Sequence, residues 1–396
     1  MKFSDLLSPV SPEVFFAEYY TEKALCIPGT AGKFQGIFSY AELNRILNSG
    51  PIPLPTLKIA RQGKPVAAGD AIAILDALQS GATLIIDKID TYWRPLRDRI
   101  NEWSEALGEP LQVNLYLSQP DMQGFLTHYD THDVFILQIA GQKRWRIFEP
   151  TVQFPTWEQK DHDRSVPDTP YMDVNLGPGN LLYVPRGHWH DATAHDETSM
   201  HLTVGINAPV AVDYLTWLSN ELRSRALWRR NLFPPGSHTA DAADRRRQIQ
   251  ARVSELEADL HATFAGEETL AAYESYCRAS AKKSFAFDLP AQLGAVADIG
   301  ARAFYRLPGQ QVWIDQDGGA GVVRVAVEDR LYTLDAAAGP LLQRIFSSNE
   351  FDFGELARVS PDLDTALIED LLSRLVLDGV IHIREAHAQP VAVSAA

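Results

Sequence analysis

Two residues with metal-binding side chains, His128 and Asp130, are separated by one residue in the segment GFLTHYDTHD. The composition favours a strand, on which both side chains leave the same face and can share one metal ion. A third ligand should come from a distant histidine, and His188 and His190 in YVPRGHWHDA both point to one face of a second strand. Two imidazoles and one carboxylate leave three positions open on a metal. This suits non-haem Fe(II), because a chelating co-substrate and dioxygen can bind together.

His132 faces the same side as His128 if the strand is regular. It lies about 13 Å further along, because each residue of a strand advances the chain by roughly 3.3 Å. We therefore do not expect His132 to join the same ion.

A basic residue follows the ligand segment. Residues 134–139 predict a strand, residues 140–142 predict a turn, and residues 145–148 predict a second strand. The turn brings Lys143 close to the metal, where its ammonium can pair with the far carboxylate of a dicarboxylate that chelates the metal. Arg144 is the alternative cation, since only one of two successive residues faces inward on a strand. Lys143 would otherwise be an ordinary solvated lysine of a turn.

Short apolar strands separated by Gly, Pro and Asp turns fill residues 112–206 and predict a double-sheet jelly roll. Residues 151–171 interrupt this pattern with charges and prolines. This segment is expected to be either a wall of the site's entrance or a surface insertion. In the closing strand, 199–206, His201 and Thr203 point to one face, where they contact the co-substrate or the substrate, or form a buried pair.

Helices should flank this sheet, because capping signals precede several runs with helical spacing. Ser11 and Pro12 begin the first, and Ser39 begins the second. Further helices are expected over residues 71–79 and 95–107. The fold class is therefore α+β, with a jelly-roll barrel and flanking helices.

The motifs H-x-D, K-R-W after a glycine turn, and P-x-G-x-x-H together resemble those of the JmjC-type cupin oxygenases. Within that family they most resemble the ribosomal-oxygenase branch. The motifs cover about residues 110–207, and the order of regions is similar over nearly the whole chain. The resemblance implies Fe(II), 2-oxoglutarate and dioxygen, a double-stranded β-helix fold, and hydroxylation of a ribosomal protein on a histidine or arginine.

The resemblance also implies roles for individual residues. The P-x-G-x-x-H spacing favours His190 over His188, so the implied iron ligands are His128, Asp130 and His190. Lys143 matches the basic residue that binds the 5-carboxylate of 2-oxoglutarate. Asn114 and Tyr116 match polar positions of the same pocket, and we add Thr203 from its place on the closing strand. The alternatives are a small-molecule hydroxylase and a metal-binding cupin without turnover.

Composition limits the partners. The chain has 396 residues, too many for one ordinary core, and a net charge of -15. This charge disfavours phosphate backbones and favours a basic protein partner. Cys26 and Cys277 show no metal-ligand spacing, so we expect two free, buried cysteines in a cytoplasmic protein. We find no signal peptide and no apolar stretch of membrane-spanning length.

We expect a catalytic domain over residues 1–208, a helical region over 209–289, a winged-helix-like domain over 290–385 and a disordered tail over 386–396. Apolar spacing predicts two amphipathic helices in the helical region, which could pack against their own barrel or against a second subunit. The resemblance implies a homodimer contact here.

The winged-helix-like domain is expected to contain three helices, over residues 331–346, 353–359 and 362–378, followed by the strand VIHI. Residues 331–385 hold four arginines, no lysine and ten acidic residues, a balance of -6. We therefore expect no DNA binding by this domain.

Overall fold

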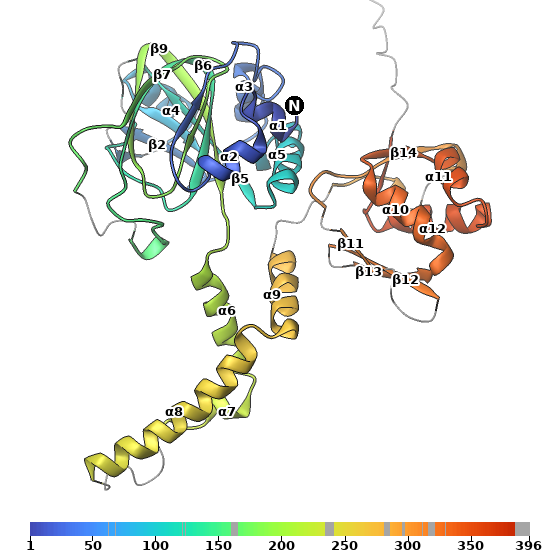
Figure 1. Ribbon diagram of the computed structural model, residues 1–396. Coiled ribbons are helices and arrows are strands. Elements are labelled where there is room, and N and C mark those ends of the chain that lie inside the picture. The colour runs from blue at the N-terminus through green and yellow to red at the C-terminus, as the bar shows by residue number, and fades with distance from the viewer. Residues whose placement is uncertain are drawn as a thin grey trace, which may run out of the picture. The chain divides into compact units, whose positions relative to one another are not determined.

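The structure of the protein is a computed structural model (Figure 1). It describes residues 1–61, 63–67, 69–120, 122, 124–159, 165–233, 241–280, 286–294, 298–310, 312–315, 321–328 and 330–384. The predicted tail, 386–396, lies outside the described residues.

A nine-stranded antiparallel sheet fills most of residues 1–208, in the order β1-β8-β6-β9-β5-β4-β2-β3 with β7 paired to β6. Its strands are β1 (Leu25–Ile27), β2 (Leu57–Arg61), β3 (Lys64–Val66), β4 (Thr83–Ile86), β5 (Leu111–Ser118), β6 (Asp133–Phe148), β7 (Met172–Leu176), β8 (Leu181–Val184) and β9 (Trp189–Ile206). The sheet curls into a barrel in Figure 1. This confirms the predicted jelly-roll fold with flanking helices.

The side-chain alternation along β5 and β9 separates a core face from a cavity face. On β5, Leu111, Val113 and Leu115 enter the main hydrophobic core. On β9, Leu202 and Val204 enter the same core. The residues between them point to the opposite face, where the site lies.

Strand β6 is continuous, whereas the sequence predicted two strands joined by a turn at residues 140–142. The pairing of β6 with β9 shifts register at Gln138, Ala140 and Gln142 instead of ending there. Gly141 allows this bulge with a φ of 65°. A Cβ atom at Gly141 would come within 2.2 Å of the Thr198 carbonyl oxygen, so the close approach also requires glycine.

Helices α1 (Phe3–Leu7), α2 (Pro12–Glu18), α3 (Tyr40–Asn48), α4 (Ala71–Gln79) and α5 (Arg94–Leu107) flank the sheet (Figure 1). The Ser11 side chain accepts a hydrogen bond from the Val14 N–H at the start of α2, and Ser39 accepts one from the Ala41 N–H at the start of α3. These caps agree with the predicted starts. Trp103 of α5 is fully buried in the core.

The chain divides into two compact units. One contains Met1–Ala208, Ser284–Gln310 and Gln343–Ala396, and the other contains Pro209–Lys283 and Gln311–Leu342. The helical region comprises α6 (Ala211–Leu222), α7 (Ala226–Arg229), α8 (Ala242–Phe264) and α9 (Glu267–Ser280). The three-domain division expected from the sequence stays a prediction.

The C-terminal part contains β10 (Ala303–Tyr305), β11 (Val312–Asp315), β12 (Val322–Val327), β13 (Arg330–Asp335), α10 (Gly339–Ser347), β14 (Glu350–Asp352), α11 (Phe353–Val359), α12 (Thr365–Leu377) and β15 (His382–Ile383). Short 3-10 helices are η1 (Ile89–Thr91), η2 (Trp157–Gln159), η3 (Ala291–Leu293), η4 (Ile299–Ala301) and η5 (Ala336–Ala338). The expectation of a helix from residue 331 was wrong, because β13 pairs with β12 along its full length. Asp335 caps η5 by accepting from the Ala337 N–H, so helical backbone begins only there.

The structure bears on two expectations, which concern the cysteines and membrane-spanning segments. Cys26 and Cys277 are free, as expected, but both are partly exposed instead of buried. Among the described residues, no helix has the length and apolar character needed to cross a membrane.

Candidate metal centre and adjoining cavity

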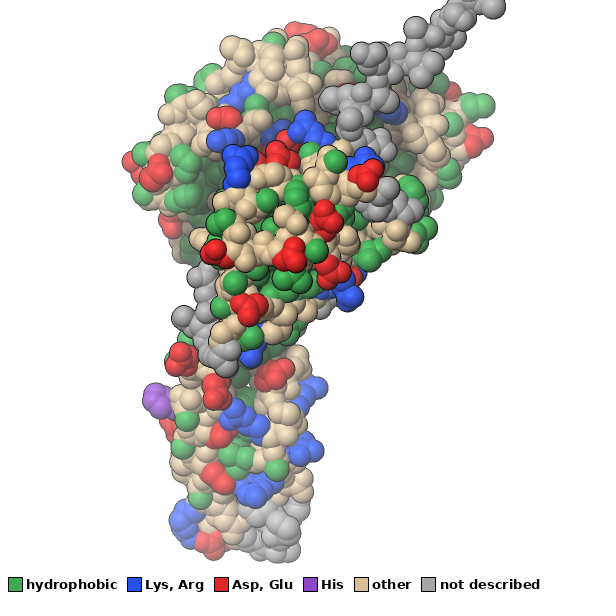
Figure 2. Space-filling model, turned by 90° about the vertical axis from the view of Figure 1, so that its right-hand side faces the viewer, with side chains coloured by type: hydrophobic (Ala, Val, Ile, Leu, Met, Phe, Trp, Pro, Cys, Tyr) green, Lys and Arg blue, Asp and Glu red, His purple; other side chains and the backbone are tan. Residues whose placement is uncertain are grey.

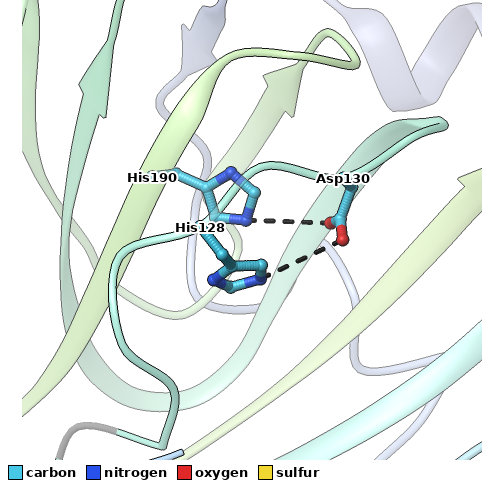
Figure 3. Close-up of side chains that lie close together, drawn as sticks. All are labelled: His128, Asp130 and His190. Atoms are coloured by element: carbon cyan, nitrogen blue, oxygen red, sulfur yellow. Dashed lines mark ion pairs between the residues drawn. The ribbon is translucent and has the colours of Figure 1, made fainter. Parts of the chain in front are cut away.

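His128, Asp130 and His190 form a cluster in which one possible ligand atom of each lies within 4.8 Å of the others. The Nε2 atom of His190 is 3.7 Å from Asp130 Oδ2, and the Nε2 atom of His128 is 4.0 Å from Asp130 Oδ1. Figure 3 shows both imidazoles directed at the same carboxylate. His190 is buried and the other two side chains are partly exposed, so solvent can reach the space between them.

The ligand segment is not the regular strand that the sequence predicted. Among residues 124–132, His128 alone forms a bridge, which is isolated and pairs it with His190. The His128 N–H donates to the His190 carbonyl at 3.1 Å, and the His190 N–H donates to the His128 carbonyl at 2.7 Å. The Asp130 carbonyl then accepts from the Gly187 N–H at 2.9 Å, so the segment follows the turn before β9 instead of a neighbouring strand.

Backbone carbonyls orient both imidazoles. Nδ1 of His128 lies 2.9 Å from the Leu126 oxygen, and Nδ1 of His190 lies 3.0 Å from the His188 oxygen. Each Nδ1 therefore carries the proton and donates it, which leaves the Nε2 lone pair facing Asp130. Burial, and then the neighbouring His128, lower the pKa of His190 to about 4 and keep its ring neutral.

This donor set fits a divalent transition metal. Neutral imidazoles with a free Nε2 and a carboxylate are the ligands of a facial triad, and hydrogen bonds from Nδ1 to backbone carbonyls are the usual support for metal-binding histidines.

His188 and His132, the other two histidines considered as ligands, lie outside the cluster. Nδ1 of His188 lies 2.7 Å from the Tyr171 hydroxyl, and the two rings are in edge contact. The ring of His132 packs over Gly205, where an added Cβ would come within 2.7 Å of it. The structure thus places His190, and not His188 or His132, beside His128 and Asp130.

The cluster lies in the wall of a cavity of about 960 Å³. The wall also includes the four residues that the sequence assigned to a co-substrate, which are Lys143, Asn114, Tyr116 and Thr203. Strands β5 and β9 place three of them, because Asn114 pairs with Thr203 and Tyr116 pairs with His201 in the ladder. The seven residues singled out in the sequence therefore share one cavity.

Lys143 is a buried cation, with 3% of its surface exposed. Its Nζ donates to the Ser118 hydroxyl at 3.1 Å, and within the described part of the chain no carboxylate lies within ion-pair distance. Burial lowers its pKa to about 7. Arg144 points the other way, as the alternation requires, and forms a bidentate ion pair with Asp173. A bound anion would relieve the cost of burying the Lys143 ammonium.

The sequence did not single out Ser118, and it left the role of His201 open. His201 stacks on Tyr116 with ring centres 4.9 Å apart, and burial holds its pKa well below the usual value. Its Nδ1 has no hydrogen-bond partner among the described residues. The sequence could have identified Ser118, because side chains alternate along a strand and Asn114, Tyr116 and Ser118 therefore share one face of β5.

Aromatic and aliphatic side chains complete the cavity. Trp145 and Trp189, which the sequence suggested as apolar walls, line it, whereas Phe148 packs against Tyr129 and Trp189. From the segment 151–171, Trp157 and Val166 line the cavity, which agrees with a wall at the entrance. Residues 160–164 of that segment lie outside the described residues.

Comparisons with known proteins place this site in a recognised domain. Residues 90–214 match the JmjC domain. The chain is 29% identical over 215 residues to Ribosomal oxygenase 1 of Gallus gallus, which covers 51% of this chain and 36% of that protein. It is 28% identical over 211 residues to the bifunctional lysine-specific demethylase and histidyl-hydroxylase NO66 of Drosophila pseudoobscura pseudoobscura, which covers 51% of this chain and 22% of that protein. The matches thus span less than half the length of these curated relatives.

The fold is similar to that of the ribosomal oxygenase YcfD of Escherichia coli. The crystal structure of that protein gives a TM-score of 0.63 at 18% identity, over 95% of this chain and 98% of that chain. Its structure in complex with cobalt and 2-oxoglutarate gives 0.59 at 18% identity, over 95% and 99%. The His128, Asp130 and His190 cluster lies inside the matched segment. Residues 90–214 are therefore similar to the JmjC domain, and ribosomal oxygenases are among the proteins that the chain resembles.

Proposed function

We propose that the protein is an Fe(II)- and 2-oxoglutarate-dependent oxygenase that hydroxylates a protein side chain. The observation that carries this proposal is the presence of the His128, Asp130 and His190 cluster and of Lys143 in the wall of one cavity. A cupin that only binds a metal has no use for a buried cation beside the metal. The complex of the similarly folded YcfD with cobalt and 2-oxoglutarate supports the same pair of ligands here.

In this proposal, His128, Asp130 and His190 would hold Fe(II), which would bind 2-oxoglutarate and dioxygen when loaded. Lys143 pairs with the far carboxylate of 2-oxoglutarate. When bound, iron and 2-oxoglutarate supply oxidising chemistry: one oxygen atom of dioxygen enters a substrate C–H bond, and the other enters 2-oxoglutarate, which becomes succinate and carbon dioxide. The protein orients the co-substrate and limits the access of water.

The substrate that we propose is a ribosomal protein, hydroxylated on a histidine or arginine. The names of the relatives, ribosomal oxygenase and histidyl-hydroxylase, support this class. The net charge of -15 favours a basic partner. Leu126 and Trp157, with 64% and 71% of their surfaces exposed, line the cavity and offer apolar contacts to a polypeptide.

We also propose that the helical region forms a homodimer contact. Among the exposed apolar side chains of this region are Leu215, Val253, Phe264, Leu270 and Tyr276. Figure 2 shows hydrophobic side chains interspersed with charged ones on the surface of the helical region. For the C-terminal residues 290–385 we retain the prediction of a winged-helix-like domain that does not bind DNA. A cytoplasmic location also stays a prediction.

Mass spectrometry of ribosomal proteins tests the proposal. Ribosomal proteins incubated with the enzyme, Fe(II), 2-oxoglutarate and dioxygen should gain one oxygen atom on a histidine or arginine. The His190→Ala variant should produce no such gain. Succinate formation without any modified ribosomal protein would favour a small-molecule substrate, and no succinate with any substrate would refute an oxygenase.

A further inference from the structure

The carboxylate of Asp191, next to the proposed ligand His190, has partners from two other segments of the chain. Its Oδ2 accepts a hydrogen bond from the Thr127 hydroxyl at 2.9 Å. Arg146 of β6 donates from Nε to Oδ1 at 2.9 Å and from Nη2 to Oδ2 at 2.8 Å. Asp191 is 4% exposed, so its carboxylate is desolvated, whereas the Arg146 side chain that pairs with it is 44% exposed. Thr127 precedes the proposed ligand His128, and Asp191 follows the proposed ligand His190. The hydrogen bond between their side chains therefore links the two ligand segments.

These contacts lie on the side of the strands that faces away from the imidazoles. The ladder between β6 and β9 pairs Arg146 with Asp191, and the isolated bridge pairs His128 with His190. Successive side chains of an extended chain point to opposite faces. The Thr127 and Asp191 side chains therefore meet on one face, and the His128 and His190 side chains meet on the other.

The bridge to β9 consists of two backbone hydrogen bonds, and no further ladder extends from it among residues 124–132. Besides the bridge, the Gly187 N–H donates to the Asp130 carbonyl at 2.9 Å, and the buried Tyr129 ring packs on Trp189 with ring centres 4.8 Å apart. A slip of one residue in an extended pair reverses the direction of every side chain, so it would turn both His128 and Asp130 away from His190. A side-chain contact that fixes the register would prevent this slip.

We propose that Asp191 is a positioning residue, and that the Thr127–Asp191–Arg146 contact fixes the register of the His128 segment on β9 before the metal binds. This inference rests on the proposed metal site. It predicts that metal affinity depends on residues that do not touch the metal. Mutating a residue bonded directly to a metal ligand typically costs about 10-fold to 100-fold in metal affinity, and for this contact one residue further out we expect the lower end of that range.

Titration of the metal-free, full-length protein with Co(II), followed by its visible absorption, tests the inference. Thr127→Val removes the hydroxyl at nearly constant size and should weaken Co(II) binding by roughly tenfold or more and change the absorption bands. Thr127→Ser keeps the hydroxyl and should restore both. Asp191→Asn removes the charge that pairs with Arg146 and should act in the same direction as Thr127→Val.

The matched control is Asp173→Asn. Asp173 holds Arg144 in a bidentate pair of similar geometry, at 2.8 and 2.6 Å, on the same sheet but with 40% of its side chain exposed and without a contact to Thr127. This variant should leave Co(II) affinity and absorption unchanged. The unfolding midpoint of each metal-free variant separates positioning from general stability, and we expect Thr127→Val to lower it no more than Asp173→Asn does.

The outcomes are distinct. Wild-type affinity and spectrum in both Thr127→Val and Asp191→Asn would overturn the inference. A loss of affinity that matches a general loss of stability, without rescue by Thr127→Ser, would also overturn it. Absence of Co(II) binding by the wild-type protein would overturn the proposed metal site itself.

Discussion

Truncating Lys143 to alanine should weaken 2-oxoglutarate binding and leave metal binding nearly intact. Lys143 is buried, lines the cavity that contains the metal cluster, and donates to the Ser118 hydroxyl. Removing one partner of a buried, hydrogen-bonded charge pair costs about 2–5 kcal/mol, much of it from leaving the other charge unpaired. At about 1.4 kcal/mol per tenfold change, this loss corresponds to roughly one and a half to three and a half decades of affinity.

The protonation state of the free protein reduces this loss at higher pH. With a Lys143 pKa of about 7, the amine is mostly protonated at pH 6 and mostly neutral at pH 8. At pH 8 the wild-type protein must take up a proton to form the pair, which costs it about one decade of affinity. The difference between wild type and Lys143→Ala should therefore be larger at pH 6 than at pH 8.

The assay is a titration of 2-oxoglutarate into the anaerobic Fe(II) protein, followed by the metal-to-ligand absorption band of the chelate. Arg144→Ala is the matched control, because Arg144 is adjacent in sequence but points to the outer face and pairs with Asp173. It should change the affinity little. Equal affinity of wild type and Lys143→Ala would refute the role of Lys143, and no absorption band in the wild type would refute the oxygenase proposal.

Three further predictions concern the pH dependence of co-substrate binding, the third metal ligand and the helical region. The wild-type affinity for 2-oxoglutarate should be highest below pH 7 and fall by up to about tenfold per pH unit above it, because the protonated form of Lys143 binds the anion; a flat profile between pH 6 and 8 would contradict this. His190→Ala should abolish binding of one Fe(II) per chain whereas His188→Ala should largely spare it, as judged by metal analysis; the reverse ranking would move the third ligand to His188. Leu215→Asp with Leu270→Asp should convert a dimer to a monomer in light scattering if the exposed apolar side chains of the helical region form the contact; an unchanged dimer would exclude them.

The residues predicted best from the sequence are those on regular strands. The direction of Asn114, Tyr116 and Thr203 follows from the alternation of side chains once the strands are known. The same rule required that only one of Lys143 and Arg144 face inward, and the resemblance favoured Lys143, although the strand that carries them was predicted as two pieces. The jelly roll itself follows from short apolar runs separated by turn residues.

The errors fall where backbone geometry depends on distant partners. Gly141 resembled a turn glycine, but the neighbouring β9 continues past it and converts the turn into a bulge. The start of the helix predicted over residues 331–346 pairs with β12 instead, which makes this segment a strand. In both cases the pairing with a distant strand outweighs the local preference of the segment. A short sequence window contains no information about that pairing.

Metal affinity and co-substrate affinity should depend on different parts of the proposed site. His128 and Asp130 lie on an irregular segment whose position depends on Asp191 and on the bridge to His190. The proposed contacts to 2-oxoglutarate come instead from strands held by long ladders. Substitutions on these strands, such as Lys143→Ala, should therefore change co-substrate affinity at constant metal affinity. Substitutions at the contact behind the ligands should change metal affinity first, and co-substrate affinity only through the metal.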